Sequence, residues 1–252
     1  MVGLYFSGTG NTKHCVEALL AQFGENLPAL AIENPGAGEC IMENDTIVLG
    51  YPVYFSNLPK IMRDFLEENQ NSFRGKKVYI LATMGLFSGD GAGCAARLLK
   101  KYGAVILGGL HVKMPDSIGD ERVLKNTPAK NREIIRRADA KIAEFAAAAM
   151  AGKPHRDGLS ALHHIAGLLG QRLWFYKKTQ TYKKKPNIDK NKCKGCGLCT
   201  EVCPMQNMAL INGKAAGSGM CTLCYRCVGH CPEKALTVLG KKVYAQCLFE
   251  KY

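Results

Sequence analysis

Hydrophobic positions in the first 150 residues alternate between short apolar runs, which are typical of buried strands, and longer stretches with helical spacing. The apolar runs lie at residues 1–6, 27–32, 46–51, 78–83 and 104–112. Stretches with apolar residues three and four positions apart lie at residues 14–23, 58–68, 91–102 and 129–150. Because strands and helices alternate, the pattern predicts an α/β fold with a doubly wound sheet of five parallel strands in the order 2-1-3-4-5.

One connection departs from this pattern. Residues 33–45 should hold the helix between the second and third strands, but they contain ENPGAG and show little periodicity. We therefore expect a short or irregular connection there, which leaves the loops at the other end of the strands intact.

The first predicted strand runs into the sequence FSGTGNT, residues 6–12, and a predicted helix follows. Hydroxyl side chains, glycines and the main-chain amides of a helix N-terminus can together hold a phosphate group. A dinucleotide-binding loop would have glycine where Lys13 stands, and a Walker A loop would need Gly-Lys-Ser/Thr, so both are excluded. An ordinary strand-to-helix turn with serine and threonine caps remains an alternative for this loop taken alone.

Two later strand-end segments accompany this loop: YPVYFSNLP at residues 51–59 and ATMGLFSGDGAG at residues 82–93. Together the three segments resemble the flavodoxin-like family over residues 1 to about 150. The resemblance implies that the first loop binds the phosphate of FMN and that the other two flank its isoalloxazine ring, at the strand ends where ligands bind in open sheets. It also implies that Tyr54 and Phe55 stack on the flavin, although either ring could instead pack in the core.

The residues that this resemblance assigns to FMN binding come from all three loops, with the backbone of residues 84–90 expected at the polar edge of the flavin. They are Ser7, Gly8, Thr9, Gly10, Asn11, Thr12, Pro52, Val53, Tyr54, Phe55, Ser56, Asn57, Thr83, Met84, Gly85, Phe87, Ser88, Gly89 and Asp90.

The composition changes near the end of the chain, where nine of the twelve cysteines lie in the last 62 residues. The run C-x2-C-x2-C-x3-C-P occurs twice, and adding 28 to each position of the first run gives the second. This is the run of bacterial ferredoxins with two [4Fe-4S] clusters, in which the fourth cysteine of each run ligates the other cluster. By that rule Cys193, Cys196, Cys199 and Cys231 hold one cluster, and Cys221, Cys224, Cys227 and Cys203 hold the second.

Residues 185–245 thus resemble the two-[4Fe-4S] ferredoxin family, a small α+β domain. Zinc sites usually take their four ligands as separated pairs, so two cysteine triplets each followed by Cys-Pro fit zinc poorly. No basic segment or cleavage site of a signal peptide precedes the first strand, so we expect a reducing, cytoplasmic setting rather than disulfides. The other four cysteines, at positions 15, 40, 94 and 247, fit no ligand pattern and are expected to be buried thiols or surface bystanders.

The net charge of +13 is also uneven, with +1 in residues 1–150, +7 in residues 151–190 and +5 in residues 191–252. Two oxidised clusters and the FMN phosphate would offset about 6 of these charges, which leaves residues 151–190 as the basic part. We expect no nucleic-acid partner, and we expect redox partner proteins with acidic docking surfaces.

The basic segment is also amphipathic. Leu159, Leu162, Ile165, Leu169 and Leu173 fall on one helical face, and Trp174 to Tyr176 and a series of lysines follow. Such a segment can lie on a membrane surface. We favour the alternative that its apolar face joins the two modules.

The whole chain resembles the flavodoxin–ferredoxin fusion proteins of anaerobic prokaryotes, the EFR-family ferredoxins. The expected organisation is an FMN domain at 1–152, a linker at 153–184 and a two-[4Fe-4S] domain at 185–252. The expected function is a low-potential carrier that converts electrons between FMN and the clusters for partner proteins. The alternative is an FMN-dependent reductase of a small quinone, nitro compound or enone. No NAD(P)H site is recognisable, and the only acid near the flavin loops, Asp90, could equally cap a helix.

Overall fold

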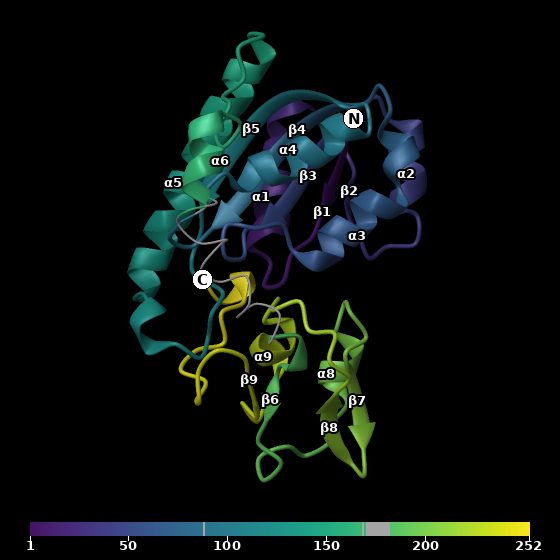
Figure 1. Cartoon of the computed structure of the whole chain (residues 1–252). Coiled ribbons are helices and arrows are strands. Elements are labelled where there is room, and N and C mark those ends of the chain that lie inside the picture. Colours follow the sequence, from purple (N-terminus) through teal and green to yellow (C-terminus); the bar gives the residue numbers. More distant parts are fainter. Residues whose placement is uncertain (88, 168, 170–181) are drawn as a thin grey trace.

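The computed structural model describes residues 1–252 except 88, 168 and 170–181 (Figure 1). Five parallel strands form the main sheet in the order β2-β1-β3-β4-β5, which confirms the predicted order. Their bounds are β1 Val2–Tyr5, β2 Ala29–Ala31, β3 Thr46–Pro52, β4 Lys77–Met84 and β5 Val105–Lys113. The strands are almost continuously apolar because helices cover both faces of the sheet.

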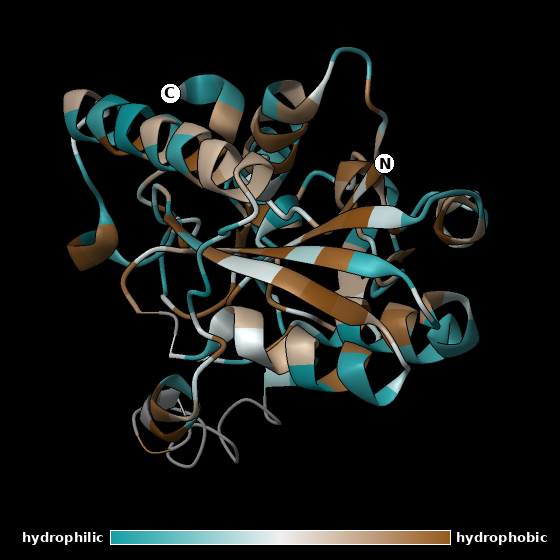
Figure 2. Ribbon diagram, turned by 90° about the horizontal axis from the view of Figure 1, so that it is seen from above, coloured by the Kyte–Doolittle hydropathy of each residue, from teal (hydrophilic) through white to brown (hydrophobic). Residues whose placement is uncertain are grey.

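Two layers of helices enclose this sheet, and the hydropathy colours in Figure 2 show brown strands between them. One layer contains α1 (Asn11–Phe23) and α5 (Pro128–Met150), which share a buried core with one face of the strands. The other layer contains α2 (Ala37–Glu43), α3 (Lys60–Glu68) and α4 (Gly91–Lys101), which pack on the opposite face. The architecture is the doubly wound sheet that the pattern predicts and the flavodoxin-like fold that the resemblance of the three loops implies.

The connection over residues 33–45 is short, as expected, but it is helical. Helix α2 has seven residues, and its Ala37 and Ile41 are fully buried. Residues four apart share one face of a helix, so a single pair of small and large apolar residues is enough to dock this short helix. A periodicity of one repeat is too brief to stand out in the sequence.

The cysteine module, residues 187–239, forms a small α+β unit from two similar halves. Strand β6 (Asn187–Ile188) pairs antiparallel with β9 (Leu236–Thr237), and β7 (Met208–Ile211) pairs antiparallel with β8 (Lys214–Gly217). Short helices α8 (Leu198–Glu201) and α9 (Arg226–His230) lie within the first and second cysteine runs.

The cysteine module lies against the edge of the main sheet at which the parallel strands end (Figure 1). The tail, residues 240–252, returns from the module to helix α1, where the Phe249 ring stacks on His14 with a centroid distance of 4.4 Å. Helix α6 (Ala161–Gly167) lies beside α4. The remaining short helices are 3-10 turns at Gln70–Phe73, Arg122–Leu124, Tyr182–Lys184 and Phe249–Lys251. No helix within the described residues has the length and apolar character needed to cross a membrane.

Candidate functional site

A cavity with an open volume of about 520 Å³ lies where β1, β3, β4 and β5 end. All three predicted FMN loops contribute to it, and a fourth segment completes the wall. The lining residues are Ser7, Gly8, Thr9, Asn11, Thr12, Pro52, Val53, Tyr54, Thr83, Met84, Gly85, Met114, Pro115, Asp116, Ser117 and Ile118. The structure therefore brings residues from three separate predicted loops to one site.

The loop between β1 and α1 carries buried hydroxyl groups at the N-terminus of a helix. The Ser7 hydroxyl accepts a hydrogen bond from the Gly10 amide at 3.1 Å, and the hydroxyls of Thr12 and Thr83 are 2.8 Å apart. This arrangement fits a phosphomonoester, since the free amides and the dipole of a helix N-terminus favour an anion.

Asn11 gives an independent test of that fit. Its Nδ2 donates to the carbonyl of Pro115 at 2.7 Å, while its Oδ1 is buried and has no hydrogen-bond partner among the described residues. A buried acceptor left unpaired is costly. A hydroxyl of the ribityl chain of FMN is a donor of the kind that would satisfy it, so the donor and acceptor set of the cavity fits the cofactor.

The segment Met114–Ile118 was missed in the sequence, although it directly follows β5 and therefore reaches the same edge of the sheet. Within it, the Asp116 carboxylate accepts the Ile118 amide at 2.8 Å, and burial raises the pKa of this carboxyl group above its ordinary value. A β-carbon at Gly85 would lie 2.5 Å from the Asp116 carboxylate, so the two loops touch. A parallel sheet makes every strand end a candidate ligand contact, and this signal could have found the segment.

Seven predicted FMN residues lie outside the cavity wall, and Ser88 lies outside the described residues. The seven are Gly10, Phe55, Ser56, Asn57, Phe87, Gly89 and Asp90. The Phe55 ring lies 5.8 Å from the ring of Tyr182, and Phe87 is half exposed. Of the two aromatic residues expected to stack on the flavin, the structure places Tyr54 at the cavity.

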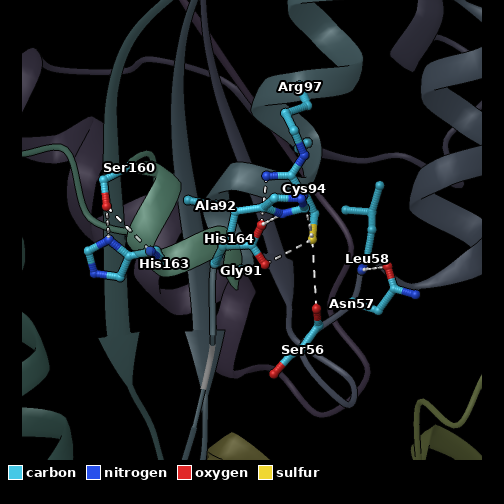
Figure 3. A network of polar contacts seen from close by, with 12 residues as sticks. Ser56, Asn57, Leu58, Gly91, Ala92, Cys94, Arg97, Ser160, His163 and His164 are labelled. Atoms are coloured by element: carbon cyan, nitrogen blue, oxygen red, sulfur yellow. Dashed lines mark hydrogen bonds and ion pairs between the residues drawn. The ribbon is translucent and has the colours of Figure 1, made fainter. Parts of the chain in front are cut away.

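A polar network around Asp90 joins α4 to α6, and Figure 3 shows its members Arg97, Cys94 and His164. Its fully buried carboxylate pairs with Arg97 at 2.6 Å and with His164 Nδ1 at 3.0 Å. Nearby, the Cys94 thiol donates to the carbonyl of Ser56 at 3.7 Å, which links the same network to the loop after β3. Asp90 thus holds the linker helix against the loop after β4.

The apolar face of the linker does not join the modules in the described residues, which corrects that expectation. Leu162, Ile165 and Leu169 are 78%, 50% and 57% exposed, whereas Leu159 packs against the core of the main sheet. Leu173 lies outside the described residues. Helix α6 is held instead by the polar contacts of His164, so its apolar stripe faces outward.

The eight predicted cluster ligands line two separate cavities of about 370 and 340 Å³. The first is lined by Cys193, Cys196, Cys199 and Cys231, and the second by Cys203, Cys221, Cys224 and Cys227. Each cavity therefore takes three cysteines from one run and the fourth from the other. Within the described part of the chain, no three His, Cys, Asp or Glu side chains form a group that could hold a single metal ion.

Main-chain amides point at several of these sulfurs, as the cluster chemistry requires. The sulfurs of Cys193, Cys221 and Cys231 each accept an amide at 3.4 Å. Burial raises the pKa of the Cys224 thiol to about 12 and that of Cys227 well above its ordinary value. Buried thiols become thiolates only beside compensating positive charge, which the iron of a cluster supplies. The donor set thus fits iron–sulfur clusters.

The second cysteine run touches the phosphate loop directly. A β-carbon at Gly8 would collide with the main-chain oxygen of Cys224, so only glycine permits this approach. The next contact is made by Arg226, which donates to the carbonyl of Ser7 at 2.7 Å and pairs with Glu33 at 2.6 Å. Cys224 also belongs to the buried core on one face of the main sheet.

Comparisons with known protein families agree with this geometry. A family model for a flavodoxin domain matches residues 3–108, and a model for a 4Fe-4S dicluster domain matches residues 185–232. A ferredoxin from Methanothermococcus thermolithotrophicus is 42% identical over 55 residues, which are 20% of this chain and 92% of that protein. These two domains imply FMN and iron–sulfur clusters as cofactors.

Solved flavodoxin structures are similar to the N-terminal part of the chain. The two-electron reduced flavodoxin of Megasphaera elsdenii is 24% identical with a TM-score of 0.42, over 58% of this chain and 98% of that one. Oxidised flavodoxin 2 from Bacillus cereus is 20% identical with a TM-score of 0.44, over 60% of this chain and 97% of that one. With a flavodoxin domain and a ferredoxin domain on one polypeptide, this electron-transfer protein is a flavodoxin–ferredoxin fusion.

Proposed function

We propose that the protein relays single electrons between FMN in the flavodoxin domain and two [4Fe-4S] clusters in the cysteine module, as a low-potential converter between partner redox proteins. The observation that carries this proposal is the contact of Gly8 with Cys224, because it gives the flavin cavity and the second cysteine cavity a common wall.

Side chains at this wall support the same proposal. Tyr54 lines the flavin cavity, and the charges of Cys224 and Cys221 act on its hydroxyl group, whose pKa is raised well above its ordinary value chiefly by burial. Tyr54 also packs against the buried core that contains Cys224. Bound FMN exchanges one or two electrons, whereas a [4Fe-4S] cluster exchanges one, so their union in one chain allows conversion between the two modes.

The first cysteine cavity lies nearer to solvent and suits the contact with an outside partner. Cys196 is exposed, and the neighbouring Leu210 and Ile211 are 44% and 59% exposed. The exposed Lys194 lines this cavity and pairs with Glu233, and the exposed Lys192 directly precedes the ligand Cys193 and pairs with Asp189. We propose that redox partner proteins exchange electrons at the first cysteine cavity. The positive charge of the linker and tail favours partners with acidic docking surfaces.

The first test is to purify the protein without oxygen and count its cofactors. We expect one flavin and about eight irons with matching sulfide per chain, following the ligand count of the two runs. A colourless protein with bound zinc would contradict the proposal. In the loaded protein, one-electron photoreduction should be followed by redistribution between flavin and clusters at a rate independent of protein concentration. A rate proportional to concentration would mean that electrons pass between chains instead.

A second candidate, reduction of a small organic acceptor at the flavin, is favoured by Asp116. This acid lines the flavin cavity, and burial raises its pKa, so it holds a proton more firmly than an ordinary aspartate. Reduction of a quinone or enone consumes protons as well as electrons. Turnover of such an acceptor by the reduced protein, lost in Asp116→Asn while electron exchange with carrier proteins persists, would favour this candidate.

A further inference from the structure

The two cysteine runs differ at positions where their backbones agree. With the offset of 28, Gly197 and Leu198 of the first run correspond to Tyr225 and Arg226 of the second. Gly197 has φ = 83° and Tyr225 has φ = 61°, so both adopt the left-handed conformation. Glycine adopts it freely, whereas a tyrosine there is strained. The second run therefore keeps an unfavourable residue where the first has the favourable one.

The contacts of these two side chains explain the difference. The Tyr225 hydroxyl donates to Asp120 of the flavodoxin domain at 2.8 Å. The Arg226 guanidinium donates to the Ser7 carbonyl, pairs with Glu33 and lies 5.9 Å from the centre of the Phe6 ring. Their counterparts in the first run, Gly197 and Leu198, have no such groups. Tyr225 and Arg226, which break the repeat, thus both touch the flavodoxin domain.

Resting on the proposed function, we propose that Arg226 is a positioning residue that fixes the flavin phosphate loop to the second cysteine run and raises the reduction potential of the cluster held by Cys203, Cys221, Cys224 and Cys227. This assigns that cluster as the neighbour of the flavin and leaves the other cluster to face outside partners.

The effect of Arg226 on the reduction potential of the cluster follows from the position of its positive charge. The Arg226 side chain is 23% exposed and its partner Glu33 is 19% exposed, so solvent screens both charges only in part. Reduction adds a negative charge to a cluster that is already anionic, and a nearby cation favours the reduced form. Arg226 follows Cys224 by two residues and directly precedes Cys227, whereas the first run has uncharged Leu198 at this place.

The test is a redox titration of the anaerobically loaded protein, followed by electron paramagnetic resonance so that the two clusters are resolved. Arg226→Leu installs the residue of the first run. It should lower the reduced-to-oxidised ratio of one cluster at least tenfold at a given potential, which is a fall of about 59 mV in its one-electron reduction potential. The potential of the other cluster should stay unchanged. Glu33→Gln removes the negative partner and should shift the same cluster in the opposite direction. Arg226→Lys, which keeps the charge, should restore most of the potential.

Lys194→Gln provides the matched control, because Lys194 lines the first cysteine cavity. It should shift the potential of the other cluster only. The FMN dissociation constant should rise severalfold in Arg226→Leu and stay unchanged in Lys194→Gln, because Arg226 contacts the phosphate loop whereas Lys194 lies at the first cysteine cavity.

Opposite shifts in Arg226→Leu and Glu33→Gln cannot come from general loosening of the fold, which would act on both variants in the same direction. Unchanged potentials, equal shifts of both clusters, or shifts of the same sign in the two variants would overturn the assignment while leaving electron transfer itself intact. If the wild-type protein lacks flavin or either cluster, the proposed function fails, and this inference fails with it. If Arg226→Leu does not fold, Glu33→Gln and Arg226→Lys still decide the outcome.

Discussion

The carboxylate of Asp120 accepts a hydrogen bond from the Tyr225 hydroxyl at 2.8 Å, although the two residues are 105 positions apart in the chain. Asp120 comes from the loop beyond β5, and its second oxygen accepts the amides of Val238 and Leu239 at 2.5 and 3.0 Å. Its side chain is 1% exposed, so these bonds form out of contact with water. One buried carboxylate thus binds three donors of the cysteine module.

Replacing Asp120 should therefore uncouple the domains. In Asp120→Ala the Tyr225 hydroxyl and the Val238 amide lose their acceptor, whereas the Leu239 amide keeps the Tyr225 oxygen at 3.2 Å. Each buried donor left unpaired costs about 1–3 kcal/mol. We expect a loss of about 3 kcal/mol, or roughly 6–12 °C in Tm, measured by differential scanning fluorimetry of the loaded protein. Asp64→Ala, which removes a surface pair with Lys60, is the control and should cost less than about 0.5 kcal/mol. Equal effects in the two variants would show that Asp120 does not join the domains.

Gly8→Ala should impair the flavin site without disturbing the clusters. The added methyl group would meet the main-chain oxygen of Cys224, which cannot move aside as a flexible side chain could. We expect the FMN dissociation constant to rise at least tenfold and electron exchange between flavin and clusters to slow, with iron content unchanged. Gly36→Ala is the control, because its φ of −81° suits alanine and its nearest neighbour would be 3.5 Å away. Normal flavin binding in Gly8→Ala would contradict the close contact.

Serine variants of Cys231 and Cys203 should show which cluster each of these cysteines ligates. Cys231 follows the second triplet in sequence but lines the cavity of the first. Cys231→Ser should therefore lose the cluster of the first cavity, and Cys203→Ser should lose the cluster of the second cavity, beside the flavin. Each variant should retain about half of the iron of the wild-type protein. Electron exchange with FMN should survive in Cys231→Ser and fail in Cys203→Ser. Cys40→Ser, outside both cavities, should keep all its iron, and the reverse pattern would refute the cross-ligation.

Asp116 should make the stability of the cofactor-free protein depend on pH. Burial raises the pKa of its carboxyl group in the folded state, so folding favours the protonated form. Its favourable contribution is full below the ordinary aspartate pKa and is lost as pH rises through the higher folded value. Asp116→Asn should therefore have the higher Tm at pH 7, and its advantage should shrink on acidification to pH 4. An advantage that does not change with pH would mean that the Asp116 carboxyl keeps an ordinary pKa in the folded state.

Much of this fold could be predicted from the sequence because its signals are local. The strands of the main sheet are buried on both faces and stand out as apolar runs, and the loop FSGTGNT lies between such a run and a helix. The cysteine runs carry their own spacing, which reflects the geometry of a cluster. The five-strand order and the grouping of the eight cysteines around two cavities agree with these signals.

The contacts between the domains could not be predicted in the same way. Asp120, Glu33 and Arg226 are single charged residues in otherwise ordinary segments, and only the folded chain brings them together. For the linker, the sequence predicted a contact that the structure does not contain. An apolar stripe at helical spacing predicts a helix but does not indicate which surface the stripe will contact. In the structure a polar contact of His164 with Asp90 orients that helix, and its Leu162 and Ile165 are exposed.

The tail that returns to the flavin loop has a consequence for how such a protein can be divided or recombined. Phe249 donates its amide to the Thr9 carbonyl at 2.8 Å, and a β-carbon at Gly10 would lie 2.7 Å from the Phe249 side chain. The outer side of the phosphate loop is thus covered by residues that follow the last cluster cysteine. A cut between the two domains would strip this cover from the flavin loop and remove Cys224 from the flavodoxin core. Exchanging either domain for a free flavodoxin or ferredoxin would therefore require new contacts on both sides, at the phosphate loop and at the segments that contain Cys224 and Phe249.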